Sequence, residues 1–219
     1  MADELTVAEA LQRRRTTGHF DPAKKLDEVQ LRRLLGLATQ APSGHNLQPW
    51  RFLVVRSEKN REKLKTCAYG QEKITEAPVV VIVLGYHHPH ETHLDPMLDS
   101  QVRRGVLTSE QAAGMKGRAR AAMSRTTDLG LWASRSAMSA AMCLMLAAES
   151  VGVHSAQVEG FDEEKVRASF GVPDDHSVGC LVCLGHARET KPFPGRFGLD
   201  VVCYQEHFGC SVGPSEAPS

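Results

Sequence analysis

The strongest constraint on the fold is the run Val79 to Leu84, which consists only of aliphatic residues and follows Pro78 directly. Its length and β-branched residues are typical of a β-strand, and a run this uniformly apolar does not suit the half-exposed edge of a sheet. Two other runs of strand length are Phe52 to Val55 and Val178 to Leu184. The sequence therefore predicts a sheet in which residues 79–84 form a central strand.

Two helices are predicted by the spacing of apolar residues. The first has apolar residues at i, i+3, i+4 and i+7, namely Leu31, Leu34, Leu35 and Ala38. Asp27, with Gln30 three residues later, provides a start that resembles a capping box. The second runs from Asp128 to Ser150 and is rich in Ala and Ser, which permit another helix to approach closely. That surface suits either a dimer seam or packing within one chain.

The composition is that of an ordinary globular protein, with 42% hydrophobic and 24% charged residues in a chain of 219. A single domain spanning residues 1–219 is expected. Lys plus Arg equals Asp plus Glu at 26 each, so the net charge favours neither nucleic acid nor an anionic membrane as a partner.

The N-terminus and the most apolar segment both argue against export and membrane insertion. Residues 1–5 include Asp3 and Glu4 and lack the apolar core of a signal peptide, so a cytoplasmic protein is expected. The uncharged run from Ser136 to Ala148 has 13 residues, fewer than the ~20 that a membrane span needs. We interpret it as part of a buried helix.

The six cysteines are scattered along the chain, which favours reduced, buried thiols over a disulfide framework. Cys180 and Cys183 form a C-x-x-C, but they fall in the predicted strand 178–184, where residues three apart point to opposite faces. A redox C-x-x-C needs a helix N-terminus, whose dipole lowers a thiol pKa. No redox role is therefore expected for this pair.

Residues 87–125 break the apolar pattern with a polar, glycine-interrupted stretch, in which Thr108 to Met123 is expected to form a surface helix. We interpret the stretch as a lid over the functional site. It opens with four histidines between His87 and His93, but Pro89 argues against an H-x-x-x-H helix face and no cysteine is near, so no metal site is expected. The Gly-, Ser- and Pro-rich segment 209–219 is expected to be mobile.

The segment from Ala41 to Phe52, A-P-S-G-H-N-L-Q-P-W-R-F, is built to hold a flat polar ligand. Its two prolines fix φ and withhold N–H groups, so the preceding helix cannot continue through it. Ser43, Asn46 and Gln48 then offer hydroxyl and amide groups to a ligand such as a heterocycle with carbonyl and ring-nitrogen positions. The alternative is a structural turn whose polar side chains satisfy their own backbone.

A second polar cluster, Arg13-Arg14-Arg15-Thr16-Thr17-Gly18-His19-Phe20-Asp21, follows another predicted helix near the N-terminus. Guanidinium groups pair bidentately with phosphate, and threonine hydroxyls can bind the remaining oxygens. The cluster therefore suggests an anion site, with a solvated basic face as the alternative.

Both segments, in this order, resemble the nitroreductase family of FMN-dependent oxidoreductases, in which an R-x-S-x-R-like segment precedes A-P-S-x-x-N-x-Q-P-W. The resemblance continues in residues 152–162, similar to the segment whose backbone approaches the flavin N5. Gly185-His186 and Pro194-Gly195-Arg196 are similar to the family's closing phosphate arm. The resemblance implies an α+β fold with a mostly antiparallel central sheet flanked by helices. It also implies an intertwined homodimer that binds FMN at its interface.

The resemblance further implies a set of FMN-binding residues. Gly18 stands where a basic residue is common in the family, so either Arg13 replaces that contact or the phosphate is held more weakly. Lys73 and Gln71 are candidates to stabilise the negative charge that reduction places at the flavin N1 and O2 edge. The set is Arg14, Arg15, Thr16, Gly18, Pro42, Ser43, Asn46, Gln48, Gln71, Lys73, Gln157, Glu159, Gly160 and Arg196, with Ser43 and Asn46 reaching from the partner subunit.

The implied reaction is ping-pong hydride transfer. NADPH or NADH reduces the flavin at N5 and leaves, and a nitroaromatic, quinone or similar electron-poor acceptor takes its place. No side chain acts as a nucleophile, and no separate dinucleotide fold with G-x-G-x-x-G is required. Two alternatives remain open: a dedicated reductase of an enone, an aldehyde or a halogenated phenol, and a non-catalytic protein that stores or senses FMN.

Overall fold

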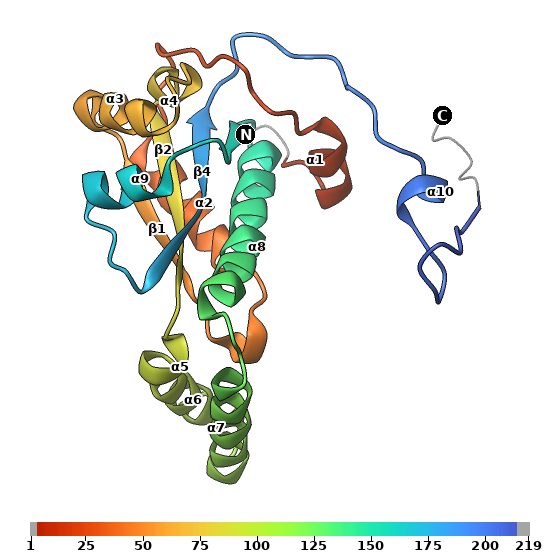
Figure 1. Cartoon of the computed structure of the whole chain (residues 1–219). Coiled ribbons are helices and arrows are strands. Elements are labelled where there is room, and N and C mark those ends of the chain that lie inside the picture. The colour runs from red at the N-terminus through yellow and green to blue at the C-terminus, as the bar shows by residue number, and fades with distance from the viewer. Residues whose placement is uncertain (1–3, 214–219) are drawn as a thin grey trace.

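The computed structural model describes residues 4–213 and contains a four-stranded sheet between layers of helices (Figure 1). The strands are β1 (Trp50–Val55), β2 (Val79–Tyr86), β3 (His154–Val158) and β4 (His176–Gly185). Their order is β1-β2-β4-β3, and all neighbours pair antiparallel. The prediction that residues 79–84 form a central strand is confirmed, since β2 has a partner on each side and the whole run is buried.

Helices cover both faces of the sheet, with α2 and α8 on one face and α3, α4 and α9 on the other (Figure 1). The helices are α1 (Val7–Arg13), α2 (Glu28–Ala38), the 3-10 turn η1 (Gly44–Asn46), α3 (Glu58–Cys67), α4 (Lys73–Glu76), α5 (Pro89–Thr92), α6 (Leu94–Arg103), α7 (Ser109–Ser124), α8 (Leu129–Ser150), α9 (Glu163–Phe170) and α10 (Leu199–Val202).

Both helices predicted from periodicity are present. Asp27 caps α2 by accepting the Gln30 N–H at 2.7 Å, and Asp128 caps α8 in the same way. By length and composition α8 could cross a membrane, but its alanine side is buried against the sheet and α2. Gly85 of β2 permits this contact, because a Cβ there would lie 2.7 Å from the Ala133 carbonyl carbon. The helix therefore belongs to the core.

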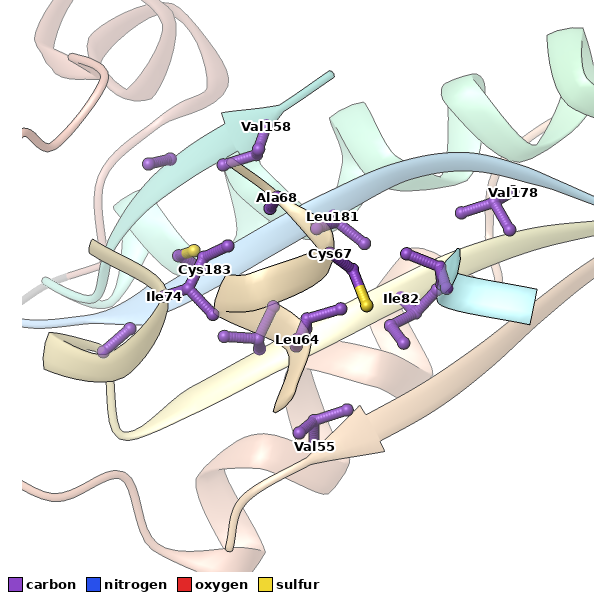
Figure 2. Packing of buried hydrophobic residues seen from close by; sticks show 14 of the residues in the cluster. Val55, Leu64, Cys67, Ala68, Ile74, Ile82, Val158, Val178, Leu181 and Cys183 are labelled. Atoms are coloured by element: carbon purple, nitrogen blue, oxygen red, sulfur yellow. The ribbon is translucent and has the colours of Figure 1, made fainter. Parts of the chain in front are cut away.

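Alternate residues of the central strands contribute to two separate hydrophobic clusters. In Figure 2, Leu64 of α3 and Ile74 of α4 pack over Ile82 and Leu181 of the sheet. Val81 and its alternate neighbours on β2 face α2 and α8 instead. Full burial of such a side chain is worth about 1.5–3 kcal/mol, so each layer of helices is held to the sheet by its own apolar set.

The C-x-x-C lies on β4, and its two thiols are in opposite clusters, as predicted. Burial raises the pKa of Cys180 and of Cys183 to about 12. Both thiols are therefore protonated at neutral pH, and neither has the environment of a redox cysteine.

We expect brief labelling of the folded protein with a thiol reagent to leave Cys180 and Cys183 unmodified and to label the exposed Cys210. The thiolate is the reactive form, and a pKa near 12 leaves a thiolate fraction of about 10⁻⁴ at pH 8. Peptide mass spectrometry identifies the labelled sites, with the protein in denaturant as the control in which every cysteine reacts. Rapid native labelling at either β4 cysteine would contradict the burial.

Residues 87–125 hold three helices where the sequence predicted one. The predicted helix corresponds to α7, which Thr108 caps. Pro89 begins α5, because the first position of a helix does not need the N–H that proline lacks. Apolar residues of α6 and α7 pack around Leu47 in a small separate cluster, and Figure 1 shows these helices extending beyond one end of the sheet. Their role as a lid stays a prediction.

After β4 the chain continues as an extended arm that leaves the body of the molecule and carries α10 (Figure 1). The arm exposes large apolar side chains: Phe193, Phe197, Leu199, Val201, Val202, Tyr204, Phe208 and Val212. Of the segment predicted to be mobile, residues 214–219 lie outside the described residues, and the mobility of 209–213 stays a prediction.

Candidate functional site

The basic segment after α1 runs beside β3. Thr16 forms a parallel bridge with Ser155, and the Thr17 N–H donates to the Ser155 carbonyl at 3.0 Å. This pairing holds the segment extended, so alternate side chains point to opposite sides. The Arg14 guanidinium has no hydrogen-bond or ion-pair partner within residues 4–213. It is therefore available to a ligand.

Arg15 and Arg196 meet on one aromatic ring. Their guanidinium carbons lie 4.6 Å and 5.2 Å, respectively, from the centre of the Phe193 ring. Arg15 also donates to the carbonyls of Gln12 and Arg14, and Arg196 donates to that of Gly195. The arm thus brings Arg196 to Arg15 from the far end of the chain, but it does not bring Arg196 into recorded contact with Arg14.

Lys191 fills the place of the side chain that Gly18 lacks. A Cβ built on Gly18 would lie 2.5 Å from Lys191 Nζ. The ammonium group therefore lies where a side chain at position 18 would begin. Arg13 lines a cavity of about 780 Å³ between α1, β3 and the arm, together with Arg15 and Glu149. Sequence reasoning missed Lys191, because contact between residues 18 and 191 depends on the path of the arm.

A second group of predicted residues gathers where β3 ends. The Gln71 side-chain amide donates to the carbonyls of Gly160 at 2.8 Å and Ala68 at 3.2 Å. Its donors are thus used, and Gln71 positions the Gly160 backbone rather than offering an N–H to a ligand. The Gly160 N–H itself has no recorded partner within residues 4–213. Gln157 donates to the carboxylate of Glu159, and Lys73, at the start of α4, makes no recorded ion pair in the described chain.

Glu76 connects the two groups and was not predicted from the sequence. Its carboxylate accepts the Phe20 N–H at 3.0 Å, lies 3.2 Å from His19 Nδ1, and lies 3.7 Å from Arg188 Nη2. The Glu76 side chain is only 17% exposed. Because Glu76 ends the helix that Lys73 begins, it fixes α4 beside the basic segment.

These contacts form a closed circuit. It runs from Thr16 to β3, along β3 to Gly160, through Gln71 to α4, and through Glu76 back to His19. These contacts therefore connect the segment predicted to bind the phosphate with the segments predicted to lie against the flavin ring.

The loop that carries Ser43 and Asn46 lies at the opposite end of the sheet. Thr16 and Ser155 lie on the row that includes Leu184 and Val79, whereas the loop leads into Trp50, opposite Gly85. Six residue steps along β2 separate the two rows, or about 20 Å at the usual rise per residue. Within one chain, the loop therefore does not reach the circuit.

The loop has an unusual backbone. His45, Asn46 and Gln48 have φ values of 54°, 55° and 48°, a region that costs a residue with a side chain about 1–3 kcal/mol. Ser43 Oγ accepts the Gln48 N–H at 2.9 Å and stabilises the turn. Ser43 therefore has the structural role that was the alternative to ligand binding, in which a side chain bonds the backbone of its own turn. The Asn46 side chain is exposed, as is Pro42, and has no recorded hydrogen bond in the described part of the chain.

His93 ties this loop to the predicted lid. Its Nδ1 lies 3.1 Å from the Leu47 carbonyl oxygen, and its Nε2 lies 2.6 Å from Arg51 Nη2. Because a guanidinium only donates, Nε2 accepts and Nδ1–H donates to Leu47, which fixes one neutral tautomer. The Arg51 guanidinium also lies over the ring of Tyr86, at 5.1 Å. Sequence reasoning placed His93 in a polar lid without a specific partner.

Comparison with known proteins identifies the family of the chain. The family model described as the nitroreductase family matches residues 11–186. An NADH dehydrogenase of Thermus thermophilus is 35% identical over 175 residues, covering 80% of this chain and 84% of that protein. An oxygen-insensitive NAD(P)H nitroreductase of Salmonella typhimurium is 27% identical over 191 residues, covering 82% and 88%, respectively. A protein of Exiguobacterium sibiricum, solved in complex with FMN, superposes with a TM-score of 0.86 at 22% identity, covering 93% of this chain and 99% of that one.

These matches confirm the family and the α+β fold class predicted from the sequence. The family uses FMN with NAD(P)H, so the predicted cofactor class and the class of oxidoreductase are confirmed with it. The match extends over most of the chain, from α1 to the end of β4. The chain therefore belongs to the nitroreductase family.

Proposed function

We propose that the chain binds FMN on the closed circuit of residues and uses NADH or NADPH to reduce small electron-poor acceptors, such as nitroaromatics and quinones. The observation that carries the proposal is the circuit itself. Together with Lys191 beside Gly18, it joins an arginine that has no recorded partner within residues 4–213, a hydroxyl, an ammonium group and an exposed backbone N–H from three segments that are far apart in the sequence. This is the donor set that a phosphate at one end and a flavin ring at the other require.

The phosphate end would consist of Arg14, Thr16 and Lys191. A phosphate monoester carries nearly two negative charges, and these groups offer two cations and a hydroxyl with no competing carboxylate recorded as their partner in residues 4–213. Each hydrogen bond to a charged group contributes about 1.5–3 kcal/mol. Lys191 compensates for the missing basic residue at position 18, so the contact is supplied by the arm instead of by the N-terminal segment.

The flavin end would lie against Lys73 and Gly160. When bound, FMN supplies the hydride-accepting and hydride-donating chemistry. The Gly160 N–H would orient the reactive edge of the ring, and Gln71 would hold that N–H in place through the Gly160 carbonyl. The Lys73 ammonium would favour the reduced, more negative state by its charge.

A second subunit would supply Ser43 and Asn46. Family members are generally dimeric, and the loop lies too far from the circuit of its own chain to meet the same flavin. The apolar arm supports the same arrangement, because its large side chains are exposed in the single chain. We therefore infer a homodimer in which each site combines the circuit of one chain with the loop of the other.

The spectrum of the purified protein tests the function. We expect a yellow protein that releases FMN, and not FAD, on denaturation. Anaerobic NADH or NADPH should bleach it, and a quinone or nitroaromatic should restore the colour. A protein that stays yellow with both nucleotides would be a flavin store or sensor, and a colourless protein that FMN cannot reconstitute would refute the proposal. Faster reoxidation by an enone, aldehyde or halogenated phenol would identify a dedicated reductase.

A further inference from the structure

Three side chains converge at the base of the predicted lid. His88 Nδ1 and His90 Nε2 each lie 3.6 Å from the same carboxylate oxygen of Glu91. All three potential ligand atoms lie within 4.8 Å of one another. His88 precedes α5, and the other two residues are in its first turn. The cluster lies apart from the circuit of Arg14, Lys73 and Lys191.

Hydrogen bonding does not account for this convergence. A separation of 3.6 Å between nitrogen and oxygen is too long for a hydrogen bond. The other ring nitrogen of His90 is buried and has no partner within residues 4–213, an arrangement that costs free energy. His87 is different, because its Nε2 lies 2.8 Å from Ser177 Oγ and is already committed.

The 3.6 Å separations between Glu91 and each imidazole are close to those around a shared metal ion, and the two imidazole nitrogens lie within 4.8 Å of each other. Bonds of about 2.0–2.1 Å in a tetrahedral site place neighbouring ligand atoms about 3.4 Å apart. Two imidazoles and one carboxylate are a donor set typical of zinc and other divalent transition metals, whereas magnesium and calcium prefer oxygen ligands. The side chains of His88 and Glu91 are 38% and 63% exposed, so an ion can enter from solvent.

We propose that His88, His90 and Glu91 form a binding site for one divalent transition-metal ion of the zinc class. Three protein ligands leave the fourth tetrahedral position open to water or a small anion. The sequence predicted no metal site because Pro89 argues against an H-x-x-x-H helix face and no cysteine is near. The structure instead draws its ligands from the residue before α5 and from its first turn, and Pro89 starts that turn. A bound ion would hold His88, which precedes α5, against the first turn of that helix.

Cobalt titration of the chelator-treated, FMN-loaded protein tests the site, because Co²⁺ substitutes for Zn²⁺ and absorbs visible light. We expect about one equivalent per chain to bind with a tetrahedral nitrogen and oxygen spectrum, without a thiolate charge-transfer band. Zn²⁺ should displace it. His90→Ala and Glu91→Gln should each weaken binding by about 100-fold, since even changes behind the ligands cost 10- to 100-fold.

His207→Ala is the matched control, because it removes an exposed histidine on the arm and should leave the cobalt signal unchanged. Circular dichroism and FMN content confirm that each variant is folded. The proposal is overturned if the parent gives no saturable cobalt spectrum, or if His90→Ala and Glu91→Gln bind cobalt like the parent. Equal weakening by His207→Ala would also overturn it, since binding would then be a general property of surface histidines.

Discussion

Replacing Lys191 by alanine is expected to weaken FMN binding by about 10- to 150-fold, the equivalent of one charge-assisted contact of 1.5–3 kcal/mol. Arg14→Ala should have an effect of the same size, because both groups are placed at the phosphate. Arg196→Ala should cost less, since its guanidinium stacks on Phe193 and donates to Gly195. Recovery of free FMN fluorescence on dilution measures the dissociation constant of each variant.

A second substitution at position 18 should restore FMN binding to the Lys191→Ala variant. In the Lys191→Ala background, Gly18→Lys should restore affinity, because it moves the ammonium group to the position where the family commonly has one. In the parent, the same substitution should not improve binding, because its Cβ would displace the flexible Lys191 Nζ, which lies 2.5 Å away, and one ammonium group would replace another. Lys25→Ala, at an exposed lysine, is the control. If Lys191→Ala binds FMN like the parent while Arg196→Ala does not, the phosphate lies on the Arg196 side of the segment.

Mixing two inactive variants is expected to restore activity if each site is shared between subunits. Arg14→Ala damages the circuit, and Asn46→Ala damages the loop, so each homodimer should be impaired at both sites. In the mixed dimer, one site collects both substitutions and the other collects neither. That dimer should therefore recover about half of the parent turnover under FMN levels that leave the homodimers mostly empty.

Differently tagged copies allow the mixed dimer to be purified and its turnover compared with that of both parents. A mixture of Arg14→Ala with Lys191→Ala is the matched control: both substitutions affect the circuit of one chain, so every site in the mixed dimer stays damaged. Absence of recovery in the test pair would place circuit and loop in the same subunit, whereas recovery in the control would mean that Arg14 and Lys191 of one site come from different subunits. A protein that remains monomeric would exclude the shared site altogether.

The helices and strands that could be predicted from the sequence are those whose signals lie within a few neighbouring residues. Asp27 with the leucines of α2, the continuous apolar run of β2, and Asp128 before α8 each report on a few neighbouring residues, and all three were found as expected. The same holds for the opposed cysteines of β4, because a strand alternates faces with a fixed period. The family could also be predicted, since its motifs are contiguous.

The site residues that sequence missed act through contacts between distant segments. Lys191 matters only because the arm returns past Gly18, and Glu76 only because α4 lies beside His19. Gln71 was found, but as a donor to a ligand; its amide hydrogens are used on the Gly160 and Ala68 carbonyls. Helices α5 and α6 were not predicted, because Pro89 and the polar histidines do not indicate the start of a helix. Proline is nevertheless favourable at the first position of a helix.

The bond network of His93 has a consequence for recombining this chain with its relatives. Leu47 and Arg51 come before β2, and His93 comes after it, yet the imidazole bonds to both. A crossover anywhere between residues 51 and 93 would take the two sides of this contact from different parents. Chimeras that exchange α6 and α7 should therefore inherit residues 47–51 from the same donor. Otherwise His93, which precedes α6, will lack its hydrogen-bond partners Leu47 and Arg51.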